Sequence, residues 1–201
     1  MNEETKPVYF KDIFLFLFMF LFFGGMVSLF PEVNVIKWVI FNSILAVLAT
    51  LIIMIIWKFH KNNSQRYYSL LSFVMLWTLT YYLMSPLFRM LYPSISFWIL
   101  LTFTLVYTIL LFMNQMKIAR AILNPRELWF KKLLLIYLFI FSGIAIVLLI
   151  YSNMFYSYWG EMLVFAIVLY LAGFLFLSLS PVFLTKPEMA KKLESMPIDN
   201  R

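Results

Sequence analysis

Six long runs of apolar residues dominate the sequence, and short polar segments separate them. The runs cover residues 13–30, 38–57, 67–91, 97–116, 133–151 and 162–183. A helix needs about 20 apolar residues to cross a hydrocarbon core about 30 Å thick, and each run is close to that length. The pattern therefore predicts an all-α integral membrane protein, built as a bundle of six transmembrane helices with short loops.

The gaps between the runs leave no room for a soluble domain. We expect a tail at 1–12, a transmembrane domain at 13–183 and a second tail at 184–201. The composition agrees, because 64% of the residues are hydrophobic and only 12% are charged, too few to cover a soluble chain. The first run is longer than the core of a signal peptide, about 7–15 residues, and no Ala-x-Ala-like cleavage site follows it. We therefore expect it to remain as a span.

Basic residues divide unevenly between the two sides that six spans would create. Of the 16 Lys and Arg residues, all but Lys37 and Arg89 fall in the two tails and in the second and fourth gaps. Lys and Arg in short loops are retained on the cytoplasmic side, so the pattern predicts that both termini are cytoplasmic. The net charge of +7 then predicts contact between this face and anionic lipids.

Tryptophan provides a second check on the boundaries of the spans. Trp77 alone falls near the middle of a run, and the other tryptophans lie at or just beyond run ends. An indole ring is stable at that depth, among lipid headgroups. We therefore expect a multi-pass protein of a plasma membrane, and the use of Lys, Ile, Phe and Asn with few Gly favours a bacterial one.

Two cytoplasmic segments carry the signals of a helix start. In Asn124-Pro125-Arg126-Glu127 a capping residue precedes proline at the first helical position, and glutamate follows at the third. The basic and aromatic residues of this segment are expected to contact lipid headgroups: Arg126, Trp129, Lys131 and Lys132. The sequence from Thr185 to Glu188 repeats the pattern, and it predicts a short helix through Ala190 to about Glu194 with Thr185 as its cap.

A polar stripe marks one face of the third run. Thr78, Tyr81, Tyr82, Ser85 and Arg89 recur at helical spacing from the middle of the membrane to its outer side, with Pro86 among them. Polar residues in a span mostly face protein or a cavity. Three more side chains are expected nearby: Asn42, Trp77 and Glu161. The cluster either locks helices together, with an Arg89–Glu161 ion pair, or binds a polar ligand in a pocket that opens outward.

Small residues predict where helices approach closely. Ser43, Ala46 and Thr50 share one face of the second run, and Ala166 and Gly173 lie on one face of the sixth. Small side chains allow the close backbone contacts that helices make within lipid.

A shift of 95 residues superposes the second and third runs on the fifth and sixth and aligns Ser85-Pro86 with Ser180-Pro181. It predicts a weak repeat of three plus three helices, inverted in the membrane.

The sequence contains little that could perform catalysis. No Asp, Glu, Lys or His lies in the middle of a run, there is no cysteine, and the single histidine, His60, lies in a basic loop. Membrane hydrolases need a base or a metal with its ligands at the reacting bond. We therefore expect no enzymatic activity, no metal and no other cofactor. No dense run of Lys and Arg alternates with exposed aromatics, so we also expect no nucleic-acid partner.

Three functions remain open. The first is a non-enzymatic accessory, regulatory or immunity-type subunit that contacts another membrane protein through its helices. The second is a solute-binding or transport subunit whose pocket lies near the outer end of the third run. The third is lipid binding or lipid handling, since the first run is apolar on every side.

Overall fold

The described part of the chain is helical. The computed structural model describes residues 12–31, 34–123 and 158–195, together with 132, 135–137, 139 and 143, and within these residues it contains no strand. The elements are α1 (Asp12–Ser28), α2 (Val35–His60), α3 (Ser64–Leu91), α4 (Ile95–Met113), α5 (Gln115–Leu123), α7 (Tyr158–Leu179), the 3₁₀ helix η1 (Ser180–Leu184) and α8 (Pro187–Ser195).

Four helices are long and apolar enough to cross a membrane. Within the described residues they are α2, α3, α4 and the continuous helix of α7 and η1, whose span covers Gly160–Leu184. The shorter helix α1 is also apolar and occupies the first predicted run, and the helix ends lie within about four residues of the predicted boundaries. The fifth run, 133–151, lies almost entirely outside the described residues, so six spans remain a prediction.

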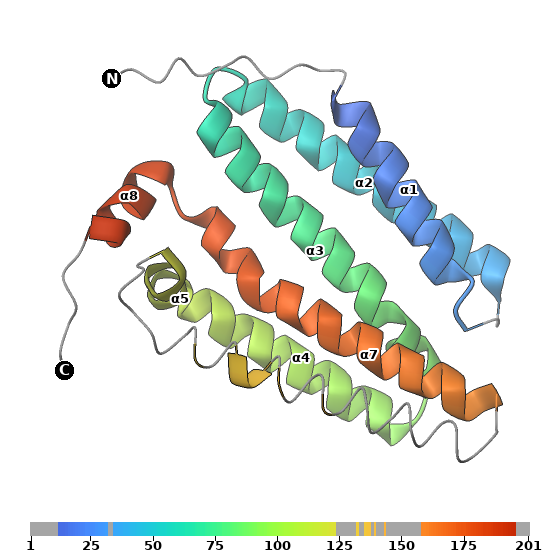
Figure 1. Cartoon of the computed structure of the whole chain (residues 1–201). Coiled ribbons are helices and arrows are strands. Elements are labelled where there is room, and N and C mark those ends of the chain that lie inside the picture. Colours follow the sequence, from blue (N-terminus) through green and yellow to red (C-terminus); the bar gives the residue numbers. More distant parts are fainter. Residues whose placement is uncertain are drawn as a thin grey trace.

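Helix α3 lies at the centre of the described bundle. It packs along α7 on one side and against α2 and α1 on the other, while α4 contacts both α3 and α7 (Figure 1). From α1 to α4 each helix runs opposite to the one before it, and α7 runs opposite to α3 and parallel to α4. The end of α2, the start of α3 and the end of α7 therefore lie together. Lys58, Lys61, Arg66 and Lys186 therefore share one end of the bundle, while Lys37 and Arg89 lie at the other. Which end faces the cytoplasm remains a prediction.

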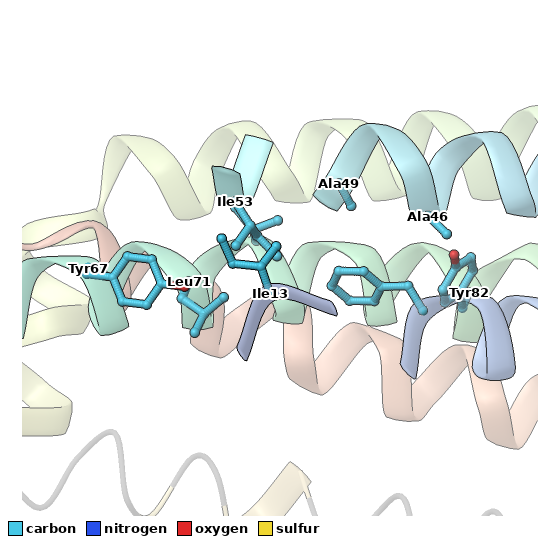
Figure 2. Close-up of a cluster of buried hydrophobic side chains, with 9 residues drawn as sticks. Ile13, Ala46, Ala49, Ile53, Tyr67, Leu71 and Tyr82 are labelled. Atoms are coloured by element: carbon cyan, nitrogen blue, oxygen red, sulfur yellow. The ribbon is translucent and has the colours of Figure 1, made fainter. Parts of the chain in front are cut away.

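Two apolar clusters cover opposite faces of α3. One joins α1, α2 and α3 and includes Phe20, Ala46, Ile53 and Tyr82; the other joins α3, α4, α5 and α7 and includes Tyr170. Figure 2 shows the first cluster, in which the small side chains of Ala46 and Ala49 face inward from α2 and the ring of Tyr82 lies beside Ala46. Both alanines are buried, so α2 approaches its neighbours closely.

Polar residues end and restart the helices at the loops. The Oδ1 atom of Asn63 accepts a hydrogen bond from the backbone N–H of Arg66 and caps α3, and Ser94 caps α4 through the N–H of Phe97. Helix α4 ends before Asn114, and α5 begins one residue later. We expected the fourth span to reach residue 116 and an inner loop from 117, so α5 was missed.

The C-terminal helix α8 forms, but its predicted cap is wrong. Pro187 is the first residue of α8, and the buried Thr185 Oγ1 atom has no hydrogen-bond partner among the residues that the structure describes. Lys186 lies outside α8, as is typical of a residue that precedes proline, and its carbonyl accepts a hydrogen bond from the N–H of Ala190 at 2.9 Å, which places it at the cap position. Thr185 consequently lies one position too early to bond the first turn.

The two Ser-Pro segments share a local hydrogen bond. Ser85 Oγ donates to the carbonyl of Tyr82 at 3.2 Å, and Ser180 Oγ donates to the carbonyl of Leu177 at 2.9 Å, three residues back in each case. Pro86 nevertheless lies inside α3, whereas Pro181 lies at the start of η1. The shared bond is local, so the inverted repeat remains a prediction.

Candidate functional site

The polar stripe of α3 faces α1 and α2 over much of its length. Thr78, Tyr82 and Ser85 are buried, and Thr78 and Ser85 each donate to a carbonyl of their own helix. A hydroxyl that bonds its own helix can be buried in an apolar environment at little cost. The stripe thus presents the phenol of Tyr82 and the guanidinium group of Arg89 to the neighbouring helices, while the hydroxyl groups of Thr78 and Ser85 bond within α3.

Asn42 joins three helices toward the Arg89 end of this stripe. Its Nδ2 atom donates to the carbonyl of Gly24 at 3.1 Å and to Ser28 Oγ at 2.8 Å, both on α1. The hydroxyl of Tyr82 donates to the carbonyl of Asn42 at 3.2 Å. Ser28 Oγ in turn donates to the carbonyl of Gly24 at 2.6 Å. We call these four residues and Arg89 the three-helix polar cluster.

Gly24 makes room for the three-helix polar cluster. A Cβ atom at this position would lie 3.0 Å from the ring carbon Cζ and hydroxyl of Tyr82 and 3.2 Å from Cβ of Asn42. Both neighbours are held by hydrogen bonds, so they cannot move away freely. Gly25, the next residue, has nothing within 4 Å of such an atom.

The adjacent glycines provide a test of this contact. We expect Gly24→Ala to lower the free energy of unfolding by about 1–2 kcal/mol, because the added methyl group overpacks a filled site. Gly25→Ala should leave it unchanged or raise it by up to about 1 kcal/mol, because alanine favours a helix over glycine. Unfolding titrations in mixed micelles would measure both, and equal effects of the two substitutions would contradict the contact.

Arg89 binds the C-terminal end of α1. Its Nη2 atom donates to the carbonyl of Val27 at 2.6 Å and also to that of Phe30. Its Cζ atom lies 4.9 Å from the ring centroid of Trp38, a cation–π arrangement. The last carbonyls of a helix lack partners within the helix and carry partial negative charge. A guanidinium group is therefore well suited to this position.

The other residues predicted for this cluster lie elsewhere. Glu161 is exposed at the start of α7, and within the described residues no ion pair joins it to Arg89. Trp77 contacts Phe73 and Phe112 on the side of α3 that faces α4. Tyr81 is half-buried, and its ring contacts those of Phe41 and Tyr82. Tyr81 therefore lies at the edge of the cluster, while Trp77 lies on a different face.

Some polar atoms of the cluster have no partner in the described part of the chain. They are Asn42 Oδ1, on a residue only 1% exposed, and the Nε and Nη1 atoms of Arg89. A buried polar atom without a hydrogen bond costs about 1–3 kcal/mol. A water molecule or another polar group at these atoms would therefore stabilise the folded protein.

The residues predicted to pack helices lie mostly at close contacts. Ala46, Thr50 and Ala166 are buried, while Ser43 is half-buried. The tightest contact is at Gly173 on α7, whose carbonyl accepts a hydrogen bond from Thr80 Oγ1 at 3.3 Å. Three residues earlier in α7, Tyr170 shares a hydrogen bond of 2.8 Å with Thr104 of α4.

The predicted headgroup contacts are only partly within the described chain. Arg126, Trp129 and Lys131 lie outside the described residues, and Lys132 is exposed. Among the described residues, no group of three or more His, Cys, Asp or Glu side chains could hold a metal ion.

Sequence reasoning missed the α1 side of the three-helix polar cluster. Gly24 and Ser28 lie four residues apart within a run that is otherwise apolar. Small residues at that spacing on one helix face are the signal that could have indicated them.

Comparison with known proteins adds no further site: the sequence matches no protein-family model, and neither a curated protein nor a solved structure is significantly similar to it.

Proposed function

We propose that this protein is a non-enzymatic accessory, regulatory or immunity-type subunit that acts through helix contacts within a membrane. The observation that carries the proposal is that the polar groups of the α3 stripe and of Asn42 bond helices within the chain. Asn42, Tyr82 and Arg89 all bond other helices of the same chain. A polar stripe used in this way gives the bundle a fixed shape, which a subunit that binds through its surface requires.

The apolar exterior supports the same proposal. Exposed aromatic rings lie on several helices, among them Phe18 on α1, Phe41 on α2 and Phe103 on α4. Such rings are stable against lipid and equally against the helices of a partner. A subunit of this kind would exchange lipid for protein along one of these faces and keep lipid on the others.

Site-specific cross-linking tests the proposal. Each of the three rings is replaced in turn by a photoreactive phenylalanine analogue, and the full chain is irradiated in native membranes. We expect one position to give a cross-link to one membrane protein, and the others to give lipid adducts. Removal of this chain should then change the activity of the captured protein. Lipid adducts at all three positions, or full solute transport by the chain alone in liposomes, would contradict the proposal.

A second candidate, a solute-binding or transport subunit, is favoured by the unpaired atoms of the cluster. Asn42 Oδ1 could accept a hydrogen bond from a polar solute, and Arg89 Nε and Nη1 could donate to one. A solute that raises the midpoint of thermal unfolding of the native protein, but not of Arg89→Ala, would favour this candidate. If every stabilising solute acts equally on both proteins, the candidate fails.

A further inference from the structure

A pocket of about 310 Å³ lies at the end of the bundle opposite the three-helix polar cluster. It is lined by His60 at the end of α2, Asn63 in the following loop, Gln65 and Arg66 at the start of α3, Lys186 before α8, and Glu188 in the first turn of α8. Its volume is at the lower end of the range for small-molecule sites. Residues from distant parts of the sequence thus form one concave polar surface.

Hydrogen bonds hold Arg66 in a fixed position at this pocket. Its Nη1 atom donates to the carbonyls of Leu184 at 3.0 Å and Thr185 at 3.3 Å. The other edge of the guanidinium group, Nε and Nη2, makes no hydrogen bond to a residue that the structure describes. Arginine presents such an edge to phosphate or carboxylate oxygens as a pair of parallel donors. One donor pair is therefore held in place before any ligand arrives.

The charges of the pocket favour an anion. Arg66 and Lys186 are positive and come from separate elements, while Glu188 is the acidic residue among the described residues of the lining. Lys58 and Lys61, both exposed, add positive charge on the neighbouring end of α2. The pocket also lies where three candidate spans begin or end, at His60, Ser64 and Leu184. Phosphate groups of lipids are found at this depth of a bilayer.

We infer that this pocket binds a phosphate group, carried either by an anionic lipid headgroup or by a small soluble phosphate. The free edge of Arg66 would bind two phosphate oxygens, and Lys186 would bind a third from the opposite element. A tetrahedral phosphate has enough acceptor oxygens to bridge both cations. The inference does not depend on the proposed function, because the pocket lies far along α3 from the three-helix polar cluster.

Two substitutions that change the charge of the pocket in opposite directions test the inference in the whole chain. Affinity is measured from the midpoint of thermal unfolding as phosphatidylglycerol is added to protein in phosphatidylcholine nanodiscs. We expect Lys186→Gln to weaken binding about fivefold, as the loss of about 1 kcal/mol from one cation implies. Glu188→Gln should strengthen binding by a similar factor. Lys37→Gln, the same change at the opposite end of the bundle, should have no effect.

The source of the phosphate is decided by a second titration. Stabilisation by phosphatidylglycerol but not by inorganic phosphate or glycerol phosphate identifies a lipid headgroup, and stabilisation by the soluble phosphates identifies a small ligand. The inference is overturned if neither probe stabilises the protein, or if Lys186→Gln and Glu188→Gln shift the affinity in the same direction. If Lys186→Gln does not fold, Glu188→Gln decides alone. An unchanged or weaker affinity of Glu188→Gln for the probe would then overturn the inference.

Discussion

Replacement of Gly173 by leucine is expected to lower the free energy of unfolding by about 3 kcal/mol, the upper part of the range for overpacked cores. A Cβ atom at Gly173 would lie 2.9 Å from Cγ of Met84, 3.1 Å from the carbonyl oxygen of Thr80 and 3.2 Å from Cβ of Leu83. The carbonyl oxygen of Thr80 belongs to the backbone of α3 and Cβ of Leu83 is attached to it, so neither atom can rotate away. The added side chain therefore has to separate α3 from α7.

The measurement is an unfolding titration in mixed micelles, with Gly25→Leu as the matched control. Gly25 is also a glycine within a helix, but nothing lies within 4 Å of a Cβ built there, so its replacement should cost less than about 0.5 kcal/mol. The hydrogen bond from Thr80 to the carbonyl of Gly173 should also be lost. A Gly173→Leu protein as stable as Gly25→Leu would show that α3 and α7 do not meet closely at this point.

This contact illustrates what the sequence could reveal. The small-residue pattern of the sixth run predicted that Gly173 lies at a helix contact, because small side chains in a span usually mark such contacts. The pattern could not predict that Thr80 and Met84 lie opposite, since helical periodicity gives the face of a residue but not the neighbour of that face. The helices themselves followed from the apolar runs.

The polar stripe shows the same limit more sharply. The spacing grouped Thr78, Tyr82 and Ser85 on one face of α3, and all three are buried in the structure. Trp77 is adjacent in sequence to Thr78 but turned by about 100° around the helix, which directs it toward α4. For Arg89, similar depth in the membrane suggested Glu161 as a partner. Depth is set by sequence position, but the angular order of the helices is set by packing, and packing brings the end of α1 to Arg89 instead.

The α5 helix was missed for a different reason. A short amphipathic helix buries only a narrow face, here Ile118, Ala119 and Ala121. Its sequence also carries Lys117 and Arg120, which read as loop residues when the basic residues are counted for topology. The charges of Lys117 and Arg120 therefore indicated a loop, whereas in the structure both residues belong to the helix α5.

The second large prediction concerns Arg89. Helix α3 carries an arginine near each end, and each arginine bonds the carbonyl end of a neighbouring helix. Arg66 donates to the carbonyls of Leu184 and Thr185 after α7, and Arg89 donates to those of Val27 and Phe30 at the end of α1. Hydrogen bonds from a charged donor contribute about 1.5–3 kcal/mol. Because two buried nitrogens of Arg89 lack partners in the described chain, part of that gain is offset.

We therefore expect Arg89→Ala to lower the free energy of unfolding by about 2 kcal/mol and to loosen the end of α1. Arg89→Lys should lose about half as much, because an ammonium group can still donate to one of the two carbonyls. Amide hydrogen exchange should accelerate at residues 28–30 and remain unchanged at 182–185. Arg66→Ala is the matched control, with the opposite pattern of exchange. If Arg89→Ala accelerated exchange equally at both ends, its effect would be a general loss of stability, and the local role of Arg89 at α1 would be refuted.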